Sequence, residues 1–251
     1  MKECLIFDIA GDFAHFRKYY TTTSPLTFLF PPRTVIIGIM GAVLGKAKHE
    51  YMDDFHTDEC GIAIQILVNP QNPIKKMTLK ENWRKGTPRI SNRGFSWGEI
   101  QEISQIPLEV LKNPAYRIYV SHNNRKVFSE LVEFIQKHKS VYTPCLGLSE
   151  FICDLDYVDV SELTRKSSNS DEFTPINTVI PKNKIEHPKL ETGKEYFETT
   201  IPNDLTNKRK FNYLDVIFER NGKPIAVKLK KEFSYYSLQN SSHDFNLLFL
   251  E

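Results

Sequence analysis

Aromatic and basic side chains alternate near the start of the chain, and together they suit the binding of single-stranded nucleic acid. Residues 13–20 combine rings with adjacent cations: Phe13, Phe16, Arg17, Lys18, Tyr19 and Tyr20. Nucleobases stack on aromatic and guanidinium planes, while Lys and Arg hold phosphates. Composition alone equally supports an ordinary loop whose rings pack into the hydrophobic core.

The residues that follow predict a buried helix that begins beside this segment. Pro31 and Pro32 cannot continue a strand, and Thr34 can cap a helix over 35–45. This run is apolar nearly all round, as in a helix that is buried on every side. Its glycines would let a strand or sheet pack closely against it. The free N–H groups of its first turn, next to Arg33, would attract a phosphate.

Two histidines, His15 and His122, are candidates for proton transfer. Metal-independent RNA cleavage needs a general base, an acid and a cation, and these groups leave no fixed spacing in a sequence. Tyr19, Tyr51 or Lys18 could act beside the histidines. Cleavage therefore stays open at this point.

The sequence predicts no metal and no cofactor. Residues 47–60 are acidic and include His49 and His56, but their spacing matches no known metal site, and charge runs usually lie on a solvated face. Residues 41–46 lack the spacing of a phosphate loop, and residues 147–151 lack the second glycine of a nucleophile elbow.

Several ordered motifs resemble the CRISPR-associated Cas-five family. The matching segments are 14–18, 30–34, 38–45 and, as a Pro-x-Leu-Gly turn, 142–148. The ordered set spans roughly residues 5–155, which is more specific than any one motif. Members of this family are subunits of type I Cascade complexes and belong to the RAMP superfamily. The resemblance implies a protein that binds guide RNA.

One branch of that family, in type I-C systems, processes guide RNA with a Tyr/Lys/His site in which Lys and His are adjacent. Here Ser121 precedes His122, so the adjacent Lys is missing. The resemblance therefore implies a non-catalytic branch, with type I-B as the expected subtype. His122 is then a polar residue at a strand end, and His15 hydrogen-bonds or stacks.

The periodicity of apolar residues predicts an α+β fold over 1–160. Strands are expected at 3–10, 61–69, 116–120 and 151–160, and helices at 35–45 and from Arg125 to about His138, the latter capped by Asn123 or Asn124. This β-α-β, insertion, β-α-β order is that of a ferredoxin-like domain, the type found in RRM proteins. The RAMP resemblance implies the same fold.

A long basic insertion at 70–115 separates the second and third strands. Residues 75–93 carry seven basic side chains and only one acidic one, a local charge of +6. Long insertions in compact domains are usually functional. In the resembled family this place holds a β-hairpin thumb that folds over guide RNA. A basic flexible loop is the alternative.

Residues 161–175 are polar and predict a linker to a small, mostly β region at 176–251. Asn221 and Gly222 indicate a hairpin between two of its strands. Its basic clusters at 208–210 and 228–231 are expected to be solvated. The role of this region stays open.

Composition and charge limit the class of protein. The net charge of the 251 residues is only +2, so a nucleic-acid surface requires local segregation of charge. The four cysteines are far apart and predict free thiols in a reducing compartment. No cleavable leader opens the sequence, and no apolar run is long enough to cross a bilayer. We expect a soluble cytoplasmic protein of a prokaryotic cell, with no membrane partner.

These observations lead to one functional hypothesis. The chain would be a non-catalytic subunit of a type I Cascade complex in antiviral defence, capping the 5′ handle of the crRNA. It would contact the backbone RAMP subunit and the large subunit, and target DNA only indirectly. The alternatives are a metal-independent endoribonuclease that processes repeat RNA, and a stand-alone RRM-like RNA binder. The predicted RNA-binding residues are His15, Phe16, Arg17, Lys18, Tyr19, Arg33, Thr34, Lys46, Arg84, Lys85, Arg89, Arg93, Leu146 and Gly147.

Overall fold

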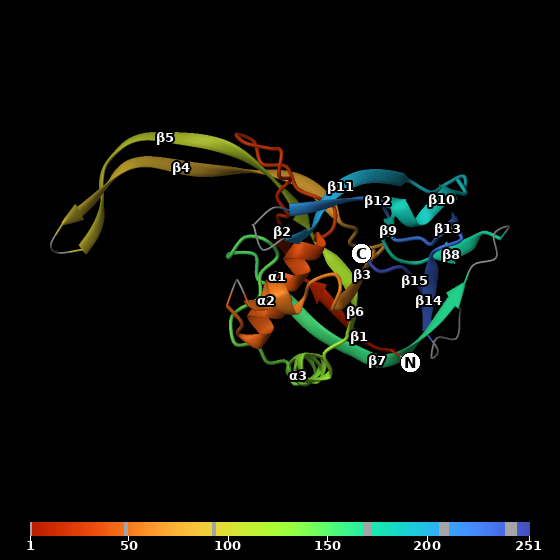
Figure 1. The fold of residues 1–251 in the computed structure, drawn as a ribbon. Coiled ribbons are helices and arrows are strands. Elements are labelled where there is room, and N and C mark those ends of the chain that lie inside the picture. Colours follow the sequence, from red (N-terminus) through yellow and green to blue (C-terminus); the bar gives the residue numbers. More distant parts are fainter. Residues whose placement is uncertain (1, 48–49, 92–93, 168–171, 206–210, 239–244) are drawn as a thin grey trace.

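The computed structural model in Figure 1 describes residues 2–47, 50–91, 94–167, 172–205, 211–238 and 245–251, with the backbone alone for 2, 81–104 and 205. Within these ranges the protein is mostly β. Helices and smaller sheets flank a central sheet, and a long hairpin projects from the body (Figure 1).

The central sheet has six antiparallel strands in the order β15-β14-β7-β1-β6-β3. Its strands are β1 (Lys2–Ala10), β3 (Cys60–Ile66), β6 (Ala115–His122), β7 (Asp154–Ser167), β14 (Ser234–Leu238) and β15 (Phe245–Leu247). Side chains alternate between the faces of a strand. Leu5, Phe7 and Ile9 of β1 therefore enter the main core, while Cys4 and Ile6 enter a smaller core on the opposite face.

Two helices, α1 (Arg33–Leu44) and α3 (Arg125–Gln136), pack against the main core, and a short α2 (Glu50–Asp54) lies beside α1. The Asn124 side chain accepts hydrogen bonds from the backbone N–H groups of Lys126 and Val127, so the predicted cap of α3 is confirmed. Such a cap satisfies N–H groups that have no partner within the helix.

The details of α1 differ from the prediction. The helix begins at Arg33 with Pro32 at its N-cap, so Thr34 lies in the first turn and caps nothing. Among the described residues, what faces its glycines is not a strand: a Cβ on Gly41 would meet the ring of Tyr51 in α2, and Gly38 has open space. Gly45 ends the helix with φ 69°, a left-handed conformation that glycine adopts without strain. The glycines thus serve a helix contact and a helix end.

The projecting hairpin consists of β4 (Lys75–Ser91) and β5 (Gly94–Lys112) and occupies the place of the predicted insertion. At its base, the two-residue strand β2 (Phe13–Ala14) pairs with Lys112 and Leu111 of β5. The hairpin is therefore joined to the aromatic segment near the start of the chain.

The C-terminal strands form two further sheets, with the orders β10-β13-β8 and β11-β12-β9. Their elements are β8 (Thr174–Ile176), β9 (Ile180–Pro181), the 3-10 helix η1 (Lys182–Lys184), β10 (Ile185–Pro188), β11 (Tyr196–Leu205), β12 (Phe211–Glu219) and β13 (Ile225–Leu229). Ile201, Leu214, Val216 and Phe218 pack into the main core with α1.

The first half of the predicted linker at 161–175 is a strand in the structure. Strand β7 continues to Ser167, and β14 pairs with this extension, so the C-terminal region completes the central sheet. Residues 246–250 are buried as well, and the Leu250 N–H donates to the Ile62 carbonyl of β3 over 2.8 Å. The polar composition at 161–167 belongs to a half-exposed strand, and such a strand lacks the apolar run that distinguishes it from a linker in sequence.

The predicted hairpin at Asn221 and Gly222 is wrong, although the turn exists. Strands β12 and β13 flank it but belong to different sheets. The Glu219 carboxylate accepts from the Asn221 and Lys223 N–H groups, and Gly222 has φ 70°. A Cβ on Gly222 would lie 2.0 Å from the Ile66 carbonyl oxygen, so the turn is packed against the end of β3. Turn chemistry is local, but strand pairing is not.

The four cysteines are free thiols, as predicted, and Cys4, Cys60 and Cys153 are buried. Burial raises the pKa of the Cys60 and Cys153 thiols to about 12. Across the part of the chain that the structure describes, none of the helices has the length and apolar character needed to span a membrane.

Candidate nucleic-acid interface

Residues 15–30 form a loop that folds back on itself. Some of its aromatic rings are buried in the core and others lie at the surface. The Phe28 N–H donates to the Phe16 carbonyl over 2.8 Å, and the Lys18 N–H donates to the Leu26 carbonyl over 2.8 Å. Phe16 is buried against Tyr116, whereas Tyr19 and Tyr20 are 49% and 58% exposed. Of the two alternatives for these rings, packing into the core therefore holds for Phe16, whose ring is not accessible to a ligand. Tyr19 and Tyr20 remain accessible.

Arg33 does not reach the surface, so the prediction of an exposed guanidinium beside the helix start is wrong. Its Nη2 donates to the carbonyls of Phe55 and Cys60 over 2.8 and 2.7 Å, and its Nη1 lies 3.8 Å from Asp204 Oδ1. Burial lowers the pKa of Arg33, and nearby Asp204 offsets part of that change. Arg33 instead joins the start of α1 to β11, which covers the first turn.

His15 and the Pro144–Gly147 turn lie in contact on the inner side of the loop. The His15 N–H donates to the Leu146 carbonyl over 3.0 Å, and a Cβ on Gly147 would lie 1.9 Å from the His15 carbonyl oxygen. His15 and Leu146 are both buried. His15 Nδ1 lies 2.7 Å from the Glu109 carbonyl oxygen. His15, Leu146 and Gly147 therefore support the loop through these contacts.

The other predicted contact residues are spread over the surface. The exposed Arg17 donates to the Thr21 carbonyl, Thr34 is half-buried, and Lys46 pairs with Asp54. Arg84, Lys85 and Arg89 lie along β4 away from its base, where only the backbone is described, and Arg93 lies outside the described residues. The structure therefore does not bring the predicted set into one site.

His122 lies apart from His15, at the end of β6. Its Nδ1 accepts from the Asn124 N–H over 2.9 Å, and its Nε2 lies 2.8 Å from the Asp54 carbonyl oxygen. Because Nδ1 accepts, Nε2 carries the ring proton and donates it to that carbonyl. Burial lowers the pKa of His122, which favours the same neutral form. Among the described residues no group of three or more His, Cys, Asp and Glu side chains could hold a metal ion.

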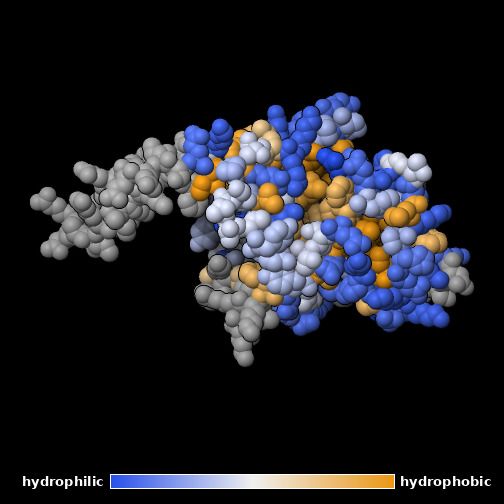
Figure 2. Space-filling model, turned by 90° about the horizontal axis from the view of Figure 1, so that it is seen from above, coloured by the Kyte–Doolittle hydropathy of each residue, from blue (hydrophilic) through white to orange (hydrophobic). Residues whose placement is uncertain are grey.

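An aromatic surface joins the loop to the C-terminal strands. It consists of Tyr19, Tyr20, Phe211 and Tyr213, each more than 45% exposed. The ring centres of Tyr19 and Tyr213 are 4.5 Å apart, and those of Tyr19 and Tyr20 are 5.2 Å apart at right angles. Seen from above the body (Figure 2), hydrophobic residues emerge between hydrophilic ones instead of forming one continuous apolar face. Such a mixed surface suits stacking of bases with phosphates alongside.

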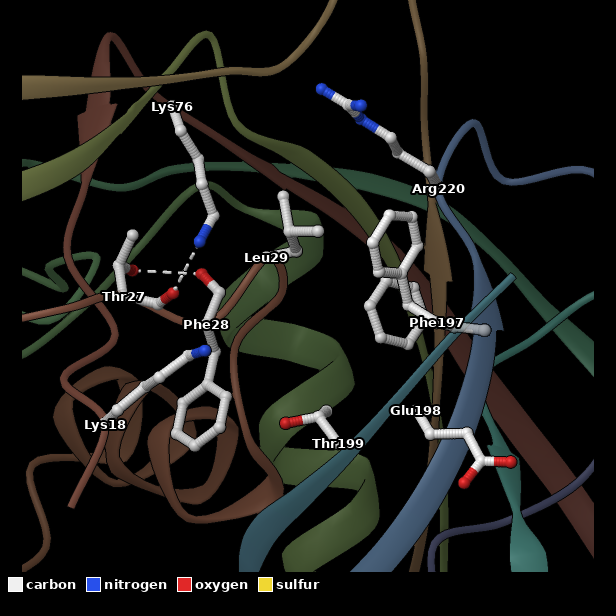
Figure 3. Close-up of a pocket in the computed structure, with 10 residues that line it drawn as sticks. Lys18, Thr27, Phe28, Leu29, Lys76, Phe197, Glu198, Thr199 and Arg220 are labelled. Atoms are coloured by element: carbon white, nitrogen blue, oxygen red, sulfur yellow. Dashed lines mark hydrogen bonds between the residues drawn. The ribbon is translucent and has the colours of Figure 1, made fainter. Parts of the chain in front are cut away.

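A pocket of about 330 Å³ opens beside this surface, between the loop, the base of the hairpin and strands β11 and β12 (Figure 3). It is lined by Lys18, Thr27, Phe28, Leu29, Lys76, Phe197, Glu198, Thr199, Phe218 and Arg220. The Lys18 ammonium lies 5.7 and 5.8 Å from the ring centres of Phe28 and Tyr20. Lys18 thus connects the pocket with the aromatic surface.

Glu109 of β5 fixes the wall of this pocket. Its Oε1 accepts from the Thr27 N–H and from Lys76 Nζ, each over 2.9 Å. Partial burial raises the pKa of Glu109, but the hydrogen bonds from Lys76 and Thr27 outweigh it and leave the pKa below its ordinary value. The carboxylate therefore stays ionised and holds the loop against the hairpin base.

Most residues of this pocket are not among those that the sequence predicts. Lys76 contributes to the sequence argument only through the charge of the insertion, and Phe197 and Arg220 lie in the C-terminal region, whose role the sequence leaves open. The same holds for Tyr213 of the aromatic surface. A signal is nevertheless present: residues 211 and 213 are aromatic positions two apart on a strand that also carries polar residues. Alternation with polar neighbours is typical of rings on an exposed strand face.

Two solved structures from CRISPR systems share the overall arrangement of this chain. One, described as a CRISPR RNA-guided surveillance complex, matches with a TM-score of 0.53 at 11% identity, over 89% of this chain and 91% of that chain. Another, a CRISPR protein from Archaeoglobus fulgidus, matches with a TM-score of 0.52 at 13% identity, over 98% of each chain. At such low identity the likeness shows a shared fold.

The family follows from the sequence itself. The family model described as CRISPR-associated protein (Cas_Cas5) matches residues 4–217. The chain therefore belongs to this CRISPR-associated family, as its motifs predicted. A comparison with curated proteins found no match.

Proposed function

We propose that this chain is a non-catalytic guide-RNA-binding subunit of a type I Cascade complex, of subtype I-B, and that it caps the 5′ handle of the crRNA. The observation that carries the proposal is the exposed aromatic surface with Lys18 beside it. Rings accept bases of any sequence, and cations hold the strand. In such complexes guide pairing supplies the sequence specificity, so this subunit needs to recognise only the handle.

The same proposal includes the finer fold. The order β7-β1-β6-β3, with α1 following β1 and α3 following β6, supports a ferredoxin-like core of the RRM and RAMP type. The hairpin of β4 and β5 would be the thumb, and its basic strand would lie against RNA and the backbone RAMP subunit. The large subunit would be a second partner, target DNA would be reached indirectly, and the complex would act in the prokaryotic cytoplasm.

The absence of catalysis is part of the proposal and rests on the two histidines. The ring nitrogens of His122 both face backbone groups, and His15 is buried. A general base or acid must reach the proton that it transfers, directly or through one water. Repeat RNA incubated with the protein in EDTA should remain intact. Specific cleavage that His122→Ala abolishes would overturn this part.

The RNA-binding role is tested with the short RNA that copurifies when the chain is expressed together with its CRISPR repeat. The wild type, Lys18→Ala and the double variant Tyr19→Ala/Tyr213→Ala are titrated with this RNA at several salt concentrations. Lys137→Ala is the matched control, because Lys137 is the C-cap residue of α3, does not line the pocket and pairs with Glu133.

Loss of one phosphate contact should flatten the salt dependence for Lys18→Ala by about 0.7 in log–log slope. The double tyrosine variant should bind at least about tenfold more weakly with the slope retained, because stacking is not a charge interaction. Recovery of no RNA, or equal binding by all four proteins, would refute the proposed function.

A further inference from the structure

The pocket beside Lys18 has the size of a single nucleotide. Its volume of about 330 Å³ lies at the lower end of the range for small-ligand sites. Four separate parts of the chain line it: the loop, the base of β4, and strands β11 and β12. It is therefore a formed concavity between packed elements, and a second nucleotide would have to lie outside it.

One wall offers an aromatic face. Phe197 is 41% exposed, and its ring stacks on Phe218 with the ring centres 5.8 Å apart and the planes at 23°. Phe218 is buried in the main core and holds that ring in place. A flat group entering the pocket can thus stack on a ring that is already supported. In Figure 3 the ammonium groups of Lys18 and Lys76 lie across the pocket from Phe197.

The charges of the pocket favour an anion at the Lys18 side. Lys18 forms no ion pair with any described residue, whereas Lys76 is occupied by Glu109 and the Thr27 carbonyl. The carboxylate that lines the pocket, Glu198, is bound by Lys182 at 2.6 Å. Arg220 lies at the rim and pairs with Glu195 at 3.1 Å. Lys18 is therefore the cation most available to a phosphate.

We propose that this pocket takes one unstacked nucleotide of the bound RNA, with its base against Phe197 and its phosphate at Lys18. The inference rests on the proposed function in that the chain must bind RNA. It adds that the C-terminal strands supply half of a specific subsite. Turning out a base costs least when the strand is already single, so the aromatic surface outside the pocket would carry the neighbouring bases.

The test removes one base at a time from the RNA that copurifies with the chain. Each abasic RNA is titrated against the wild type, Phe197→Ala and Phe173→Ala. Phe173 is the matched control, because it is an exposed ring of the C-terminal region that lies neither in the pocket nor on the aromatic surface. Thr199→Phe adds a ring inside the pocket from a half-buried strand position and keeps Phe197.

In the wild type, each base that stacks in the pocket or on the aromatic surface should cost about tenfold in affinity when it is removed. One of these positions should become insensitive in Phe197→Ala and in Thr199→Phe but stay sensitive in Phe173→Ala. Thermal unfolding of each variant shows that the fold is kept, and Thr199→Phe gives a second route if Phe197→Ala unfolds.

Two outcomes separate the inference from the function on which it rests. RNA binding in which every base position responds alike in wild type and Phe197→Ala would overturn the pocket and leave the RNA-binding role intact. Failure of the wild type to bind any of these RNAs would remove both. Crystals soaked with uridine monophosphate or with ribose phosphate alone give a direct check, because only the nucleotide should order on Phe197.

Discussion

Residues that the sequence predicts to bind RNA differ sharply in burial in this protein. Phe16 and Tyr19 are three positions apart, yet one ring is buried and the other is half-exposed. Arg17 is at the surface, whereas Arg33 is fully buried and donates to carbonyls of Phe55 and Cys60. A buried guanidinium is tolerable only because carbonyls and a nearby carboxylate replace its hydration.

This placement predicts a stability effect for Arg33→Ala. The substitution removes a buried guanidinium that donates to the Phe55 and Cys60 carbonyls and lies near Asp204, and loss of one member of such a buried network typically costs about 3–5 kcal/mol. Urea unfolding measures the change in the free energy of unfolding. Arg17→Ala, at an exposed position, should stay within about 0.5 kcal/mol of the wild type. Equal midpoints for the two variants would contradict the structural role of Arg33.

At the scale of elements, the loop over 15–30 has its shape because β5 holds it. Glu109 accepts from Thr27 and Lys76 through its carboxylate, and its backbone N–H donates to the Pro25 carbonyl over 3.0 Å. The loop, the hairpin base and the pocket wall are therefore one unit. Whatever neutralises Glu109 should loosen all three.

The lowered pKa of Glu109 gives a pH-dependent prediction. A carboxylate whose pKa falls on folding stabilises the fold above its unfolded pKa, near the ordinary value of 4.5, and that stabilisation is lost as the pH falls through the folded pKa. Glu109→Gln should be less stable than the wild type at pH 7, and the difference should close below about pH 4.5. Urea midpoints across pH measure this. Glu130→Gln, an exposed site on α3, should show neither effect.

At the scale of the whole molecule, the C-terminal third is part of the main body. It supplies β14 and β15 to the central sheet and buried side chains to the main core. Its strands β11 and β12 also carry half of the candidate site. The projecting hairpin is the opposite case, since the distal parts of β4 and β5 pair mainly with each other.

A truncation follows from this difference. A chain ending at residue 160 cuts β7 and removes its partner β14, so we expect it to lack cooperative unfolding and dispersed amide resonances. Replacing 80–107 with Asn-Gly, a two-residue turn between the paired residues Leu79 and Leu108, should leave the urea midpoint unchanged. If the 1–160 fragment unfolds cooperatively, this prediction is wrong and residues 1–160 form an independent domain.

The sequence by itself determined the local elements and the family. Periodicity located β1, β3, β6, α1 and α3, because side-chain repeats are a property of neighbouring residues. The Asn124 cap and the turn at Gly222 were predictable for the same reason. The order of the motifs along the chain is enough to indicate the CRISPR-associated family, since motif order is a property of the sequence alone.

Only the tertiary structure decided which groups meet. Lys18, Lys76, Phe197 and Arg220 share a pocket although up to about two hundred residues separate them along the chain. Strand pairing, the burial of Arg33 and the continuation of β7 beyond a polar stretch depend on contacts between distant segments. Such contacts leave no fixed spacing in a sequence, because burial is set by what the rest of the chain places on each surface.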